Sequence, residues 1–265
     1  MHRRENLVLF VDMGTNGEVV LGHKEWLICA SSSAGPAFEG GQIGRGMIAA
    51  AGAIERVAFD GDVTVSTIEG ARARGICGSG LISAVARMLE MGVINHQGKF
   101  ERDLGTRRIR QTNDVWEYVL AWKDDTDIGR NIVLTEIDIE NLIRAKGAIY
   151  SGCLTLLKEV GLDFEAVDQI LLAGGFGACI DLTQAITIGL LPDVDPQRIH
   201  YIGNGSLRGA GLTLLSRQLW DELHEIARRI TYFELSSWPG YMDEFMAALF
   251  LPHTDGSLFP SVKSP

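Results

Sequence analysis

The chain has 265 residues, of which 46% are hydrophobic and 22% charged, a normal balance for a globular protein with one large domain or two small ones. Its formal net charge of −10 argues against nucleic acid or an anionic membrane as the main partner. No apolar run approaches the roughly 18 residues that a membrane-spanning helix needs, so we expect a cytoplasmic protein.

Two short apolar runs, residues 7–11 and 19–21, predict the first two strands, because they are rich in β-branched side chains and too short for typical helices. The turn between them contains Asn16-Gly17, the strongest short-range signal for a β-hairpin. Glycines also let a backbone approach a ligand closely, and successive N–H groups form a nest for an anion. Asp12, after the first run, can hold a hydrated Mg²⁺. An ordinary hairpin with a polar tip remains the alternative.

Strands and small-residue loops follow. Residues 25–33 predict a third strand, and residues 34–41, with one proline and three glycines, predict a loop suited to backbone packing against a ligand. The alanine-rich residues 47–59 predict a helix. Alternation of polar and apolar side chains in residues 62–69 predicts another strand.

The turn Cys77-Gly78-Ser79-Gly80 leads into an amphipathic helix predicted for residues 81–91. Such a turn can bind an anion, because the free N–H groups of the first helical turn point outward. The alternative is a tightly packed turn in which Ser79 caps the helix. Cys77 is either a thiol made reactive by the helix N-terminus or a small core residue.

The middle of the chain combines an irregular segment with a long helix. Residues 95–130 are polar and poorly periodic, and predict an excursion with short strands whose arginines and tryptophans form a partner surface or a solvated face. An amphipathic helix is predicted for residues 137–160, with Thr135 or Asp138 as its N-cap. Lys146 lies off the most apolar stripe of this helix.

A second glycine-rich turn follows an apolar strand predicted for residues 169–173, which runs straight into Gly174, Gly175 and Gly177. Ligands of α/β proteins bind at the carboxyl end of such a strand, beside the next helix, here predicted for residues 181–190. Because glycines are costly in chain entropy, this pattern favours a binding loop over a loose connection.

The remainder predicts a strand at residues 199–202, a small-residue helix at 207–216, and a tail at 217–265 with a helix, a strand and a helix. The order of elements indicates the α/β class with a mixed sheet. Three apolar residues of the tail could pack in the core or at a homodimer interface: Phe245, Leu249 and Phe250.

Four cysteines are spread along the chain without a Cys-x-x-Cys pair, so neither a zinc ribbon nor a ferredoxin-type cluster is expected. In a chain without signal-peptide features, such cysteines indicate reduced thiols in the cytosol.

Six motifs carry a resemblance to known proteins. Three resemble the phosphate, adenosine and connecting-helix motifs of the superfamily of actin, sugar kinases and heat-shock chaperones: VDMGTNGE at 11–18, LLAGGFG at 171–177 and GNGSLRGA at 203–210. Three more resemble, within it, ATP-dependent reductive activators of corrinoid proteins: AGPAFEG at 34–40, CGSGLI at 77–82 and FLPHTD at 250–255. The resemblance covers essentially the whole chain and implies a ribonuclease-H-like lobe of the actin and sugar-kinase type.

The resemblance also implies an activity. Such activators use ATP and Mg²⁺ to drive uphill electron transfer to a corrinoid protein, reducing its Co(II) to the Co(I) form that methyl transfer needs. Asp12 would position Mg²⁺ or the attacking water, and Glu18 would orient that water or face away from the site. The residues implied to hold ATP are Gly14, Thr15, Asn16 and Gly17 at the phosphates, Gly174, Gly175 and Gly177 under the adenosine, and Lys146 at the ribose or base.

The chain also departs from this family. Full members carry an N-terminal 2Fe–2S domain and a first lobe with its own phosphate motif, and nothing in this sequence matches either. We therefore expect residues 1–265 to form one lobe, the second of two, that hydrolyses ATP feebly alone and needs those domains in the same or another chain. A non-catalytic binding or dimerisation module of the same fold and a small-molecule kinase of the superfamily remain alternatives.

Overall fold

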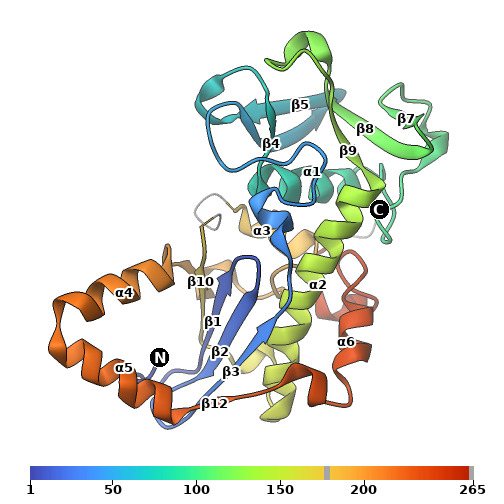
Figure 1. Ribbon diagram of the computed structural model, residues 1–265. Helices are drawn as coiled ribbons and strands as arrows, with labels where there is room; N and C mark the ends of the chain where they lie inside the picture. Colours follow the sequence, from blue (N-terminus) through green and yellow to red (C-terminus); the bar gives the residue numbers. More distant parts are fainter. Residues whose placement is uncertain (176–179, 263–265) are drawn as a thin grey trace.

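The computed structural model describes residues 1–175 and 180–262, and its centre is a six-stranded mixed sheet (Figure 1). In the order in which they lie side by side, the strands are β11 (Ile199–Tyr201), β10 (Gln169–Ala173), β1 (Val8–Met13), β2 (Gly17–Gly22), β3 (Leu27–Ser32) and β12 (Ile230–Tyr232). The strands from β1 to β3 pair antiparallel, whereas β10 pairs parallel with both β1 and β11. The predicted α/β class with a mixed sheet is confirmed.

The long helix α2 (Glu136–Glu159) packs against β2 and β3. Both predicted caps act together, because the Thr135 hydroxyl accepts from the Asp138 N–H at 3.1 Å and the Asp138 carboxylate accepts from the Thr135 N–H at 2.9 Å. A Cβ on Gly17 would lie 2.9 Å from Ile149 Cγ1 of α2. Glycine at position 17 therefore lets the helix approach the sheet.

The segment between β3 and α2 forms two small sheets and the helix α1 (Gly78–Glu90), at the top of Figure 1. The first sheet consists of β5 (Asp62–Thr67), β4 (Ala53–Asp60) and β6 (Gly75–Ile76). The second consists of β7 (Ile109–Thr112), β8 (Val115–Ala121) and β9 (Ile132–Thr135). Two of these strands, β7 and β8, lie where the sequence predicted an excursion with short strands.

The prediction of a helix for residues 47–59 is wrong. Residues 53–60 form β4, in which Ala53, Ile54 and Val57 are buried. Alanine favours a helix locally, but the β-branched side chains of this segment pack between β5 and β6 and against α1, and that packing outweighs the weak preference of alanine.

An ion pair joins the two small sheets. The guanidinium of Arg108 donates to both carboxylate oxygens of Asp62 on β5, with Nη2 at 2.6 Å from Oδ2, and also to the Val119 carbonyl of β8 at 2.8 Å. Its side chain is only 8% exposed, whereas that of Asp62 is 63% exposed. The hydrogen bond from Arg108 is the main cause that lowers the pKa of Asp62 from 3.8 to about 2.

Replacing Asp62 by asparagine is expected to lower the free energy of unfolding at pH 7 by about 0.5–1 kcal/mol, since the carboxylate is mostly in water. Because the folded-state pKa is depressed, this contribution is complete above pH 3.8 and disappears as the pH falls through about 2. Urea unfolding of both proteins between pH 7 and pH 2 measures the difference. A difference that stays constant over this range would contradict the assignment.

The remaining helices are α3 (Leu182–Thr187), α4 (Gly205–Leu215), α5 (Arg217–Arg229) and α6 (Tyr241–Ala247). Gly17 and its partner Met13 face α2, and Phe10, three residues before Met13 on β1, points to the other face of the sheet. A Cβ on Gly205 would lie 3.5 Å from the Phe10 ring, so α4 starts on the face of the sheet opposite to α2. None of the helices in the described part of the chain is long and apolar enough to cross a membrane.

Candidate nucleotide site

The turn after β1 is held in shape by its own backbone. The Gly14 N–H donates to the Asn16 carbonyl at 3.0 Å, and the Gly35 N–H donates to the Thr15 carbonyl at 2.7 Å. The N–H groups of Thr15 and Asn16 have no partner among residues 1–175 and 180–262, and both residues are exposed. Two N–H groups of the predicted phosphate turn are therefore free to bind an anion.

Glu39 lies beside this turn and was missed in the sequence. Its carboxylate accepts from the Thr15 hydroxyl at 3.1 Å, and a Cβ on Gly14 would lie 3.6 Å from it. One feature of the sequence could have pointed to Glu39, namely its position in the glycine-rich loop at 34–41, which was predicted to pack against a ligand. Glu39 fixes the rotamer of Thr15 and adds a negative charge beside the turn.

Asp12 and Glu18 are directly opposite each other on β1 and β2. Opposite residues of an antiparallel pair point to the same face, with Cβ atoms about 4.5–5.5 Å apart, so the two negative charges repel each other. The Ser206 hydroxyl, from the first turn of α4, donates to Asp12 Oδ2 at 3.1 Å. A cation between the two carboxylates would offset their repulsion.

The metal would not be held by protein ligands alone. The described residues contain no group of three or more His, Cys, Asp or Glu side chains arranged to hold a metal ion. Mg²⁺ usually keeps several waters and binds through one or two carboxylates and the phosphates of the substrate. The carboxylate pair fits that mode of binding.

Gly174 forms the start of the second glycine-rich turn. Its φ is +120°, and a Cβ would lie 2.3 Å from the Met13 carbonyl oxygen. The Tyr201 hydroxyl donates to the Gly174 carbonyl at 2.7 Å, and the Gly174 N–H donates to the Gly203 carbonyl at 3.2 Å. Gly174 is therefore needed for the chain to pass between the ends of β1 and β11.

Gly175, the next residue, lines a hollow of about 320 Å³. A Cβ on Gly175 would have no heavy atom of residues 1–174 or 180–262 within 4 Å, so this residue faces away from the described part of the chain. The predicted Gly177 lies outside the described residues. The other described residues that line the hollow come from the segment between β3 and α2: Phe38, Glu39, Met47, Ile48, Ala49, Ile68, Cys77, Gly78 and Ser79. Residues 47–49 line the hollow but were not predicted as site residues, because the sequence predicted a helix there.

Of the two interpretations of the turn at 77–80, an anion-binding turn or a tightly packed one, the structure shows the tightly packed turn. A Cβ on Gly78 would lie 2.1 Å from the Phe38 carbonyl oxygen, and one on Gly80 would lie 2.0 Å from that of Ile54. The helix begins at Gly78 with Cys77 in the N-cap position, so Ser79 is not the cap. Cys77 is 2% exposed, as expected of a small core residue.

Lys146 requires a correction. Its side chain is fully buried, and its ammonium group donates to the carbonyls of Phe250 and Pro252 at 2.5 and 2.6 Å. Burial lowers its pKa well below 10.5. The lysine therefore anchors the C-terminal tail on α2 and does not contact the ribose or base as predicted.

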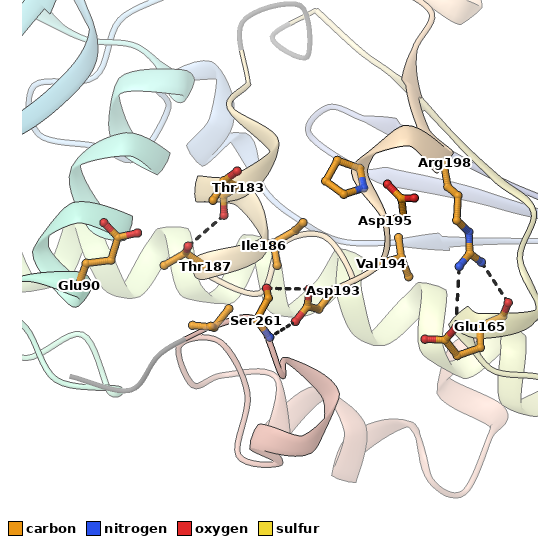
Figure 2. A pocket seen from close by; sticks show the side chains of 12 residues that line it. Glu90, Glu165, Thr183, Ile186, Thr187, Asp193, Val194, Asp195, Arg198 and Ser261 are labelled. Atoms are coloured by element: carbon orange, nitrogen blue, oxygen red, sulfur yellow. Dashed lines mark hydrogen bonds and ion pairs between the residues drawn. The ribbon is translucent and has the colours of Figure 1, made fainter.

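A larger hollow, of about 770 Å³, lies elsewhere on the molecule (Figure 2). It lies beside α3 and the loop before β11, whereas Gly175 follows the carboxyl end of the parallel strand β10. Its polar side chains serve the fold: Asp193 accepts from the Ser261 N–H at 2.7 Å, and Arg198 donates to the Phe164 carbonyl at 2.9 Å. None of the predicted site residues that the structure describes lines this hollow.

A family model described as the C-terminal domain of RACo, the ASKHA domain, matches residues 6–263. The chain belongs to this family. The match confirms the predicted ribonuclease-H-like lobe of the actin and sugar-kinase type, which is a nucleotide-binding fold.

Several characterised relatives align with most of the chain. The corrinoid activation enzyme RamQ of Eubacterium limosum is 33% identical in an alignment 252 residues long, which covers 92% of this chain and 42% of the relative. The Co(II) methylated amine-specific corrinoid protein reductase of Methanosarcina barkeri is 31% identical in an alignment 246 residues long, which covers 84% of this chain and 42% of the relative. A solved structure, the reductive activator for corrinoid, iron-sulfur protein, is 50% identical with a TM-score of 0.93, over 97% of this chain and 42% of that chain. This chain thus spans about two fifths of each.

Proposed function

We propose that this chain is the nucleotide-binding lobe of an ATP-dependent activator that reduces the Co(II) form of a corrinoid protein to Co(I) for methyl transfer. The observation that carries the proposal is the hollow at Gly175, next to a turn with free N–H groups and a pair of carboxylates. The relatives, whose names refer to corrinoid activation or reduction, support the substrate class.

The residues present fit ATP and Mg²⁺. The free N–H groups of Thr15 and Asn16 would bind phosphate oxygens, and the open side of Gly175 would seat the adenosine. Asp12 and Glu18 would hold hydrated Mg²⁺ at the phosphates. Bound ATP would supply the free energy for the uphill reduction, and the residues of this lobe bind and orient it.

An exposed apolar surface supports a need for further domains. No residue of α4 or α5 is buried, and six large side chains on these two helices are 44–88% exposed: Leu207, Leu212, Leu214, Leu215, Trp220 and Leu223. The two helices pack against each other, and soluble monomers rarely leave large apolar areas uncovered. We propose that a first lobe, in the same or another chain, packs on α4 and α5, and that an iron–sulfur domain supplies the electron. The assembly would act in the cytoplasm.

The exposed surface of α4 and α5 also favours a second candidate function, a non-catalytic binding or dimerisation module. The tail is a poorer interface for a homodimer, because Phe245, Leu249 and Phe250 are only partly exposed and Leu249 already packs against the core. The module would associate through α4 and α5 without binding nucleotide. Nucleotide affinity therefore separates the two candidates.

Calorimetric titration of the chain with ATP, with and without Mg²⁺, tests the proposal. We expect micromolar binding with Mg²⁺, about −8 kcal/mol, and roughly tenfold weaker binding after Asp12→Asn. Without Mg²⁺, Asp12→Asn should bind ATP as the unchanged chain does and unfold at the same or a higher temperature, because it removes the carboxylate repulsion.

The control is Glu159→Gln, which removes an exposed carboxylate at the far end of α2 and should change neither affinity nor stability. If the unchanged chain gives no heat at millimolar nucleotide, the binding-module candidate takes precedence. If Asp12→Asn retains the full effect of Mg²⁺, Asp12 is not the metal ligand.

A further inference from the structure

The outer face of the sheet formed by β7, β8 and β9 is cationic. Tyr118 on β8 and Leu134 on β9 are paired and buried in the core. Neighbouring residues along a strand point to opposite faces, so Glu117 and its partner Arg110 on β7 point away from the core. This outward face is where charged groups from other parts of the chain gather.

A hollow of about 360 Å³ lies on this face. Four of the residues that line it are basic and come from three places in the chain, since the last two share one loop: Arg45, Arg110, Lys123 and Arg130. One lining residue, Glu117, is acidic. The nucleotide hollow at Gly175 shares no residue with this one, so both sites could be occupied together.

The single carboxylate is already neutralised. Glu117 is 8% exposed and accepts from Arg110 Nε at 2.8 Å and from the Thr112 hydroxyl at 3.1 Å. By contrast, the side chains of Arg45, Lys123 and Arg130 form no ion pair or hydrogen bond with any residue in the described part of the chain. Three positive charges without an ion-pair partner among the described residues therefore line one hollow in a chain whose net charge is −10.

The loop that carries two of these charges is held in place. The buried Thr126 hydroxyl donates to the carbonyls of both Lys123 and Arg130, at 3.0 and 2.8 Å. The Lys123 N–H donates to Asn131 Oδ1 at 2.8 Å. The guanidinium of Arg110 also stands over the Trp122 ring, 5.9 Å from its centroid. The backbone positions of these cations are therefore fixed before a partner binds.

We propose that this cationic hollow, defined by Arg45, Arg110, Lys123 and Arg130, is the docking site for an acidic surface segment of the corrinoid protein. The inference rests on the proposed function, which requires this lobe to meet a corrinoid protein. An acidic partner is repelled by most of a chain with net charge −10 and attracted at this hollow, which would set its orientation on approach. Lys123 and Arg130 are exposed at the rim and can reach the surface of another protein.

Association kinetics test the inference. The corrinoid protein in its Co(II) form is immobilised, and the 265-residue chain is compared with the double variant Lys123→Glu/Arg130→Glu. The control Arg87→Glu/Arg144→Glu changes the net charge equally, at exposed positions on α1 and α2. In about 50 mM salt the test variant should associate at least about tenfold more slowly, and the control within about twofold of the unchanged chain. The difference should vanish near 0.5 M salt, where screening is strong.

The outcomes separate this inference from the proposed function. Equal association of the test variant and the unchanged chain would overturn the docking site while leaving the function intact. Failure of the unchanged chain to bind at low salt would overturn both the corrinoid partner and the docking site. If calorimetry shows that pyrophosphate binds the chain and loses affinity in the test variant while corrinoid association is unaffected, the hollow is a small-anion site and the inference fails. In every variant, Mg·ATP affinity should match that of the unchanged chain.

Discussion

Replacing Gly175 by valine is expected to weaken Mg·ATP binding by about 100-fold or more, about 2.8 kcal/mol, without lowering stability. The new side chain would extend into the hollow where the adenosine is proposed to lie. The position accepts a Cβ, because none of the described residues places a heavy atom within 4 Å of it and its φ is not left-handed. We expect the unfolding temperature to stay within about 2 °C of that of the unchanged chain.

Gly174→Ala is the matched comparison one residue earlier. Its Cβ would lie 2.3 Å from the Met13 carbonyl oxygen at a φ of +120°. The free energy of unfolding of this variant should be about 2–4 kcal/mol lower. Its nucleotide affinity should fall only because the turn that carries Gly174 is destabilised. Calorimetry and thermal unfolding of both variants separate the two effects. Undiminished binding by Gly175→Val would show that the adenosine lies elsewhere.

Lys146→Met is expected to lower the free energy of unfolding by about 2–4 kcal/mol. Methionine retains the apolar stem but leaves the carbonyls of Phe250 and Pro252 without their donor. Each unpaired buried carbonyl costs about 1–3 kcal/mol, and relief from burying an amine offsets part of that loss. Chemical unfolding measures the change, and we expect the tail after α6 to lose protection from hydrogen exchange first.

The pH dependence of stability gives a second test of Lys146. Because burial lowers its folded-state pKa, the unfolded chain binds the proton more tightly. Stability should therefore fall as the pH falls from 10.5 towards the lowered pKa, and this slope should be absent in Lys146→Met.

Lys158→Met on the same helix is the control, because Lys158 is exposed and its one side-chain partner in the described part of the chain is Glu244, in a surface ion pair worth at most about 1 kcal/mol. Equal effects of the two lysine variants would contradict the anchoring role.

The parts of the fold that the sequence predicted correctly are those specified by local patterns. The hairpin of β1 and β2 follows from two apolar runs around Asn16-Gly17, and the start of α2 follows from Thr135 and Asp138, which cap it reciprocally. The glycine-rich turns could be placed at strand ends for the same reason.

The features that the sequence predicted wrongly or missed depend on contacts between residues far apart in the chain. Lys146 lies off the apolar stripe of α2, but the tail, about a hundred residues later, covers that side and buries the lysine. Glu39 could not be paired with Thr15 before β3 and its following loop were folded back on the turn. Residues 47–59 have a helical composition, and packing between β5, β6 and α1 makes the part from residue 53 onward extended.

The pairing of β1 has a consequence for synthesis of the chain. Its hairpin partner β2 follows immediately, but on the other side Val8 pairs with Gln169, which emerges only after the two small sheets and α2. At about 5–20 residues per second, the free edge of β1 waits roughly 8–30 s for β10. During that time an apolar strand edge is available to other chains. A ribosome that stalls before residue 169 would therefore release a product prone to aggregation, and folding of the central sheet can finish only near the end of translation.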